Sequence, residues 1–217
     1  VEIEFNNKKY SFSTSLIGKL QVKNLLFAIL AASKSKINFN KIVGSISSIK
    51  PVEGRLESVG NIKNNSKVIL DYAHTPDALK YTLESIKEQF NQSSISIVFG
   101  CGGNRDRDKR PIMGKIANQY CDKIFLTDDN PRYENPKKIR NQIKKKISRS
   151  KLVEISSRKK AIKVAIDNLK SGDILIVAGK GHEIYQEYKG KKKIFSDKKN
   201  ILKAINLKNK KLFKNWK

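Results

Sequence analysis

Cysteine is scarce in this chain, which has only Cys101 and Cys121 among 217 residues. Two cysteines are too few for a disulfide-stabilised scaffold, and they lack the paired spacing of a zinc site. We therefore expect two reduced thiols with no role in a site.

Long apolar runs are also missing. No stretch approaches the roughly 20 apolar residues of a membrane helix. The N-terminal segment VEIEFNNKKY has neither an initiator Met nor the apolar core of a signal peptide. These absences predict a soluble, cytoplasmic protein with no membrane partner.

Acidic residues are few: 20 Asp and Glu stand against 46 Lys and Arg, giving a net charge of +26. Such a charge first suggests nucleic acid. The lysines, however, are spread from Lys8 to Lys217 without a recognition helix or an RNA-binding aromatic pair. We expect no dedicated nucleic-acid site, although a non-catalytic basic domain that binds polyanions remains an alternative.

The order of elements predicts an α/β fold. Five short runs rich in Ile and Val read as buried strands: 67–71, 94–100, 123–128, 151–156 and 173–179. Between them lie helical patterns that begin at Pro76, Pro111, Pro136 and the Ser156–Ser157 pair, the last ending on Gly172. This alternation predicts a Rossmann-like, mostly parallel sheet with helices on both faces.

The chain ends differ from this alternation. Residues 184–197 read as a hairpin with Gly190 in its turn, which we expect to place an antiparallel strand at the sheet edge, and Asp197 is expected to cap a last helix. Residues 1–50 read as two strands and two helices, too few to close a core of their own. We therefore predict a boundary, with residues 1–50 the tail of another domain and residues 51–217 the α/β domain.

Polar segments follow four of the predicted strands: 71–76 (DYAHTP), 100–110 (GCGGNRDRDKR), 128–132 (DDNPR) and 179–183 (GKGHE). Each alone has a structural explanation, such as a tight turn at the glycines, an Asx turn, or a structural role for His74 and His182. Ligands of open α/β sheets bind at the carboxyl ends of strands, where all four segments fall. Together they predict a binding site.

The same segments, preceded by GRLE at 54–57, resemble the C-terminal domain of the Mur ligases, in particular the MurE type. LIGKLQVKNLLFAILAA at 16–32 resembles the end of the family's central ATP-binding domain. The resemblance implies that 1–50 is a C-terminal remnant of that central domain and 51–217 the amino-acid-binding domain. The UDP-sugar domain, the ATP loop and the carbamylated lysine of the family have no counterpart here, so we expect a segment that is inactive alone.

The resemblance also implies roles for individual residues. Asp129, Asn130, Pro131 and Arg132 match the motif that selects meso-diaminopimelate, whose carboxylate suits the bidentate fork of an arginine. Further amino-acid contacts are implied for Arg105, Gly179 and Glu183, and nucleotide-side positions for Arg55, Asp71 and His74. Lys109 and Arg110 face either phosphate or solvent.

The implied reaction is ATP-dependent amide-bond formation that adds meso-diaminopimelate to UDP-MurNAc-L-Ala-D-Glu in peptidoglycan precursor synthesis. ATP and Mg²⁺ are the implied cofactors, with the metal ligands expected mostly in the central domain and no catalytic or metal-binding residue in this segment. Another Mur ligase, or a ligase of the folylpolyglutamate synthase type, is a second alternative beside the polyanion-binding domain.

Overall fold

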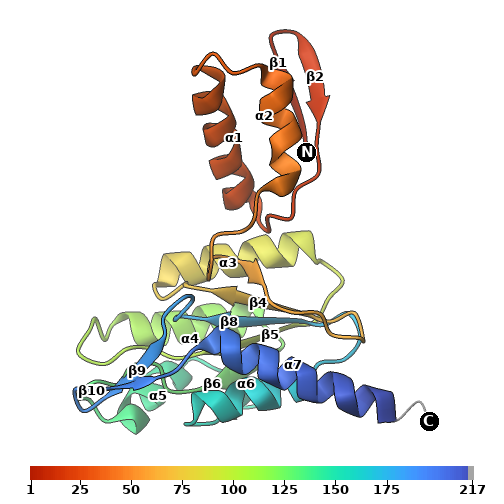
Figure 1. The fold of residues 1–217 in the computed structure, drawn as a ribbon. Coiled ribbons are helices and arrows are strands. Elements are labelled where there is room, and N and C mark those ends of the chain that lie inside the picture. The colour runs from red at the N-terminus through yellow and green to blue at the C-terminus, as the bar shows by residue number, and fades with distance from the viewer. Residues whose placement is uncertain (215–217) are drawn as a thin grey trace. The chain divides into compact units, whose positions relative to one another are not determined.

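The computed structural model describes residues 1–214, which divide into two compact units between Val52 and Glu53. Figure 1 shows the elements of both units.

The first unit consists of a hairpin and two helices. Strands β1 (Glu2–Phe5) and β2 (Lys8–Ser11) pair antiparallel across a turn in which Asn6 and Asn7 both have positive φ, as type I′ hairpins require. They are followed by α1 (Lys19–Ser33), α2 (Phe39–Ser45) and the short 3₁₀ helix η1 (Ile46–Ser48). The Asn38 side chain caps α2 by accepting the N–H of Asn40.

This unit has a small core, contrary to the expectation that it would have none. The buried side chains are Leu25, Ile29, Ile42 and Ile46, and the Phe39 ring stacks on Phe5 with centroids 4.1 Å apart. Ile3 of the hairpin and Phe39 of α2 pack against this cluster, so a segment of this size can bury a few residues.

The second unit contains a six-stranded sheet in the order β3-β4-β8-β5-β6-β7. Its strands are β3 (Glu57–Ser58), β4 (Lys67–Asp71), β5 (Ile95–Phe99), β6 (Lys123–Leu126), β7 (Leu152–Glu154) and β8 (Ile174–Ala178). All neighbours pair parallel except β3, which runs antiparallel to β4 at the edge. The predicted sheet, with its antiparallel edge, is confirmed.

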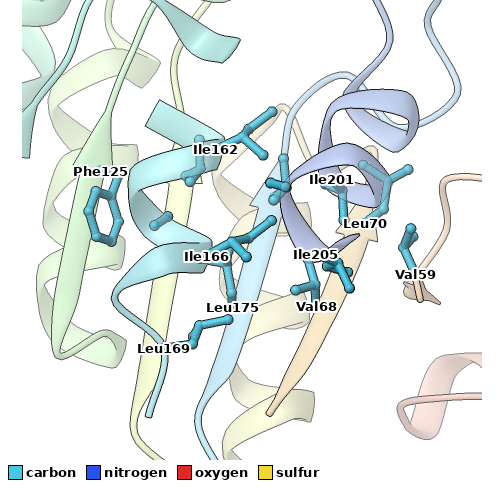
Figure 2. Packing of buried hydrophobic residues seen from close by; sticks show 14 of the residues in the cluster. Val59, Val68, Leu70, Phe125, Ile162, Ile166, Leu169, Leu175, Ile201 and Ile205 are labelled. Carbon is cyan, nitrogen blue, oxygen red and sulfur yellow. The ribbon is translucent and has the colours of Figure 1, made fainter. Parts of the chain in front are cut away.

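The helices of this unit are α3 (Pro76–Gln89), α4 (Lys109–Tyr120), α5 (Pro136–Lys144), α6 (Arg158–Asp167) and α7 (Asp197–Lys214). Helices α3, α4 and α5 pack side by side, whereas α6 and α7 pack together and against the sheet. Alternate strand residues such as Val68 and Leu175 meet Ile162 and Ile201 in the core between the sheet and α6 and α7 (Figure 2).

Three details differ from the sequence predictions. Helix α4 begins at Lys109 rather than Pro111, which still lies in the first turn, where no N–H is needed. Helix α6 ends at Asp167, and Gly172, at φ 78°, belongs to the following turn. The cap of α7 is Ser196, whose hydroxyl accepts the N–H of Lys199, because the Asp197 carboxylate is buried against Arg158.

The C-terminal hairpin also differs. Strands β9 (Tyr185–Tyr188) and β10 (Lys191–Ile194) pair around Gly190 as predicted, but they form a separate two-stranded sheet. The prediction that this hairpin supplies the antiparallel edge strand is wrong. Tyr188 instead bridges to Arg132, in the loop after β6, so the hairpin lies over the carboxyl ends of the strands.

Candidate functional site

The four polar loops converge on one cavity of about 650 Å³ at the carboxyl ends of β4, β5, β6 and β8. Most of the predicted site residues line it: His74, Arg105, Asp129, Asn130, Arg132, Gly179 and Glu183. Arg55, Asp71 and Pro131 are not among the lining residues. Parallel pairing explains the convergence, because it brings the ends of strands far apart in the sequence to one edge.

The loop after β6 presents two acceptors and one guanidinium to the cavity. Asp129 and Asn130 are both buried, and the Asp129 carboxylate accepts the Asn130 N–H at 2.7 Å. Arg132 has a φ of 52°, in the left-handed region that non-glycine residues seldom adopt. Its Nη1 donates to the carbonyl of Gly103 at 2.9 Å, and its Nε lies 3.5 Å from Glu187. These contacts fix the direction of the guanidinium.

The loop after β8 contributes an acid and a buried base. Lys180 is fully buried, and its Nζ donates to Glu183 at 2.7 Å and to the side-chain oxygen of Asn130 at 3.0 Å. The Asn130 amide in turn donates to Glu183 at 3.0 Å. The two loops are therefore joined by a closed ring of hydrogen bonds that includes an ion pair.

Strand β9 holds the loop after β6 from the other side. The Gln186 amide donates to the carbonyls of Asp128 and Asp129, at 3.2 and 2.9 Å, and the Glu187 N–H donates to the Asn130 side chain at 3.1 Å. The Arg132 N–H donates to the Glu187 carbonyl. This contribution could not be predicted from the sequence, because nothing in the local pattern of 185–188 shows which loop it meets.

The loop after β5 is fixed by a residue that faces neither phosphate nor solvent. Arg110 is completely buried and makes a bidentate ion pair with Glu134, at 2.9 and 3.0 Å, and also donates to the Gly102 carbonyl. These hydrogen bonds lower the pKa of Glu134 to about 2. The exposed Arg105 extends from the loop so held and lines the cavity.

The residues predicted to face the nucleotide separate into two groups. The Asp71 carboxylate is buried and accepts the Leu56 N–H at 3.1 Å and the Thr82 hydroxyl at 2.7 Å, so it anchors the segment after Arg55. The Arg55 guanidinium lies 4.5 Å from the centre of the Tyr72 ring, and Lys109 donates to the His74 carbonyl. A basic and aromatic wall is thus formed by Arg55, Tyr72, His74 and Lys109.

A third buried cation, after Lys180 and Arg110, lies beneath the site. Arg158 is fully buried, donates to both oxygens of Asp197 and to the Ala178 carbonyl, and has its Nη1 3.9 Å from Asp129. Within the described residues 1–214, that Nη1 has no hydrogen-bond partner. Arg158 could not be singled out from the sequence, since it lies at the start of a lysine-rich helix.

Three remaining expectations concern cysteines, metals and membranes. Cys101 and Cys121 are both free and buried, and burial raises the pKa of Cys101 to about 12. Residues 1–214 contain no group of three or more His, Cys, Asp or Glu side chains arranged to hold a metal ion. Within the same range, the structure has no helix with the length and apolar character needed to span a bilayer.

Residues 54–181 match the family model described as Mur ligase, glutamate ligase domain. The chain belongs to the Mur ligase family. The match begins at the segment that Asp71 anchors and ends within the loop that carries Lys180, so it includes three loops of the cavity in full and residues 179–181 of the fourth.

The relatives are consistent with this family. A Rickettsia felis protein named UDP-N-acetylmuramoyl-L-alanyl-D-glutamate–2,6-diaminopimelate ligase is 46% identical over 207 residues, covering 95% of this chain and 38% of its own length. The Rickettsia prowazekii protein of the same name is 42% identical over 206 residues, covering 94% and 42%. This chain spans about two fifths of the length of these curated Mur ligases.

Solved structures agree on the fold. A structure of a ligase with that name superposes with a TM-score of 0.73 at 35% identity, covering 93% of this chain and 41% of that one. The MurF ligase of Thermotoga maritima in complex with ADP has a TM-score of 0.62 at 15% identity, over 97% and 43% of the two chains. At that low identity the second likeness concerns the fold alone.

Proposed function

We propose that this Mur ligase segment binds meso-diaminopimelate and presents it for addition to UDP-MurNAc-L-Ala-D-Glu; the names of its relatives, which specify 2,6-diaminopimelate, support the proposal. One observation carries the proposal. Acceptors for an ammonium group (Asp129 and Glu183) and guanidinium groups for a carboxylate (Arg105 and Arg132) line a single cavity. Meso-diaminopimelate has an ammonium and a carboxylate at each end.

The placement of the groups supports an assignment of roles. Arg132, whose guanidinium is fixed by Gly103 and Glu187, binds the distal carboxylate, and Glu183 and Gly179 meet the distal ammonium. Arg105, exposed and unconstrained by an ion pair in the described residues, reaches the carboxylate beside the reacting amine. Pro131 restricts the loop backbone between two of these contacts.

The wall formed by Arg55, Tyr72, His74 and Lys109 fits the nucleotide side of the site, where ATP would activate the D-Glu carboxylate. The described residues supply no cluster suited to Mg²⁺, so no step is assigned to the metal here. Residues 1–52 are proposed to be the end of the family's central ATP-binding domain. We propose a cytoplasmic reaction, because its proposed substrates are nucleotides.

The contribution of this segment to the chemistry is orientation. The amine of diaminopimelate attacks the acyl phosphate carbon, a C–N bond forms, phosphate leaves, and the amine gives up a proton. Holding both ends of the amino acid converts this encounter into a step within one complex. We expect no ligase turnover from the 217-residue chain alone.

The test is calorimetric titration of the chain with meso-diaminopimelate, with L-lysine as the matched ligand. L-Lysine lacks the distal carboxylate and should bind at least about tenfold more weakly, because the Arg132 guanidinium then has no ligand carboxylate to bind. Raising the salt from 50 to 300 mM should change the affinity only modestly. Equal binding of both amino acids, or the steep salt dependence of counterion release, would instead support the polyanion-binding domain.

A further inference from the structure

Lys180 carries a positive charge that is fully buried directly behind the cavity. Removing an ammonium from water is costly unless it is paired and hydrogen-bonded. Its Nζ meets this requirement with Glu183 at 2.7 Å and with Asn130 at 3.0 Å, both of which line the cavity. The burial of this charge therefore depends on its hydrogen bonds to Glu183 and Asn130.

The ring of contacts fixes the orientation of both groups. Lys180 and the Glu187 N–H donate to the same Asn130 oxygen, so the amide nitrogen of Asn130 must point to Glu183. Both hydrogen bonds that Glu183 accepts end on Oε2. Its other oxygen, Oε1, is thus the one presented to a ligand in the cavity.

We infer that Lys180 is a positioning residue that makes the site specific for an amino acid with a second, distal ammonium group. It acts through Glu183 and Asn130 and need not touch the ligand. This inference rests on the proposed function, since that function supplies the ligand.

Loss of Lys180 has two opposing effects on Glu183. The negative charge of Glu183 is no longer neutralised by Lys180, so it attracts an ammonium more strongly. The carboxylate also loses its ion pair with Lys180 and keeps only the hydrogen bond from Asn130. The Glu183 side chain is 22% exposed. Without Lys180, the partly exposed Glu183 carboxylate should turn toward water. An ion pair that a solvated carboxylate makes with the ligand ammonium contributes little, so the lost orientation of Glu183 should outweigh its uncompensated charge.

The experiment compares two ligands on the full 217-residue chain by calorimetry: meso-diaminopimelate and 2-aminopimelate, which lacks only the distal amine. The wild-type chain should prefer meso-diaminopimelate by at least about tenfold, because a ligand without the distal ammonium leaves the acceptors of the site unpaired. Lys180→Met should reduce this preference to within about threefold. If Lys180 merely supported the fold, its substitution would weaken the binding of both ligands equally and leave the ratio of their affinities unchanged.

Lys208 offers a matched control. It is also a buried lysine, and its Nζ donates to the carbonyls of Asp167 and Leu169, which do not line the cavity. Lys208→Met should keep the wild-type ratio even where it lowers the melting temperature. Should Lys180→Met fail to fold, Lys180→Gln keeps a donor without the charge and is judged by the same ratio.

The outcomes separate the two proposals. A wild-type chain that binds neither ligand contradicts the proposed function itself. A wild-type chain that discriminates, with an unchanged or larger ratio in the folded Lys180 variant, contradicts the role of Lys180 alone.

Discussion

Arg132 combines a strained backbone with a fixed side chain. Its φ of 52° is unfavourable for a residue with a Cβ, yet a glycine there would lose the guanidinium that Gly103 and Glu187 orient toward the cavity. Such strain is retained where the surrounding structure holds the residue in place. Here the backbone contacts with Glu187 and Lys189 do so.

Arg132→Ala should therefore weaken binding of meso-diaminopimelate by about 2 to 5 kcal/mol, or on the order of 30-fold to several thousand-fold, in a calorimetric titration. Arg132→Lys should recover little of it, because an ammonium cannot reproduce the planar fork. Arg149→Ala, at an exposed position outside the cavity, is the control and should bind normally. Full recovery by lysine would show that charge alone is recognised.

Glu134 should contribute to stability in a defined pH range. The bidentate pair with Arg110 lowers its pKa from 4.5 to about 2, so the ionised form stabilises the fold above about pH 5, and the contribution is lost as the pH falls toward 2. Glu134→Gln should lower the melting temperature by about 3–10 °C at pH 7, for a loss of about 1–3 kcal/mol. The difference in melting temperature between Glu134→Gln and wild type should shrink as the pH falls from 7 to 2. A difference that stays constant with pH would contradict the assignment.

The residues that could be predicted from the sequence are those in contiguous motifs. Asp129, Asn130 and Arg132 stand together and fall at a strand end, so their place in a site followed from the order of elements. Gln186 and Arg158 bind partners 20 to 58 positions away in the chain, and Lys180 binds Asn130, 50 positions away, as well as Glu183 in its own loop. No local pattern encodes such pairings, which become visible only when the sheet is assembled.

At the scale of elements, two helical glycines have opposite roles. A Cβ on Gly114 in α4 would lie 2.2 Å from the carbonyl oxygen of Ile143 in α5, whereas Gly44 in α2 has nothing within 4 Å of that position. Gly114 therefore permits the close approach of two helices, and Gly44 has only the conformational cost of glycine.

Gly114→Ala should destabilise the second unit by at least about 2 kcal/mol in urea unfolding, because the backbone of α5 must move despite the better helix propensity of alanine. Gly44→Ala should slow hydrogen exchange of the α2 amides by a factor corresponding to about 0.5–1 kcal/mol. A neutral or stabilising effect at Gly114 would mean that the helices separate at little cost.

Strands and helices were largely predictable, but the position of the hairpin was not. Alternation and Gly190 identify β9 and β10, yet the choice between the sheet edge and the loop after β6 depends on the hydrogen bonds of Gln186 and Glu187. The two-residue strand β3 was missed because its pairing with β4 depends on the Asp71 anchor at Leu56.

At the scale of the whole chain, the division at Val52 and Glu53 has an experimental consequence. The second unit contains a large core around Leu175 and Ile201, whereas the first buries only four side chains in its cluster. Amide exchange reports the free energy of the opening that exposes each amide, so protection in residues 1–52 should be weak and should be lost at lower urea than protection in the sheet.

A shortened chain of residues 53–217 tests the same division through function. Every residue that lines the cavity belongs to the second unit, so this chain should fold and bind meso-diaminopimelate within about threefold of the affinity of the 217-residue chain. Circular dichroism and calorimetry would measure both properties. If deletion of residues 1–52 abolished binding while the sheet remained folded, or if all amides exchanged with one common protection, the two units would have to be treated as one.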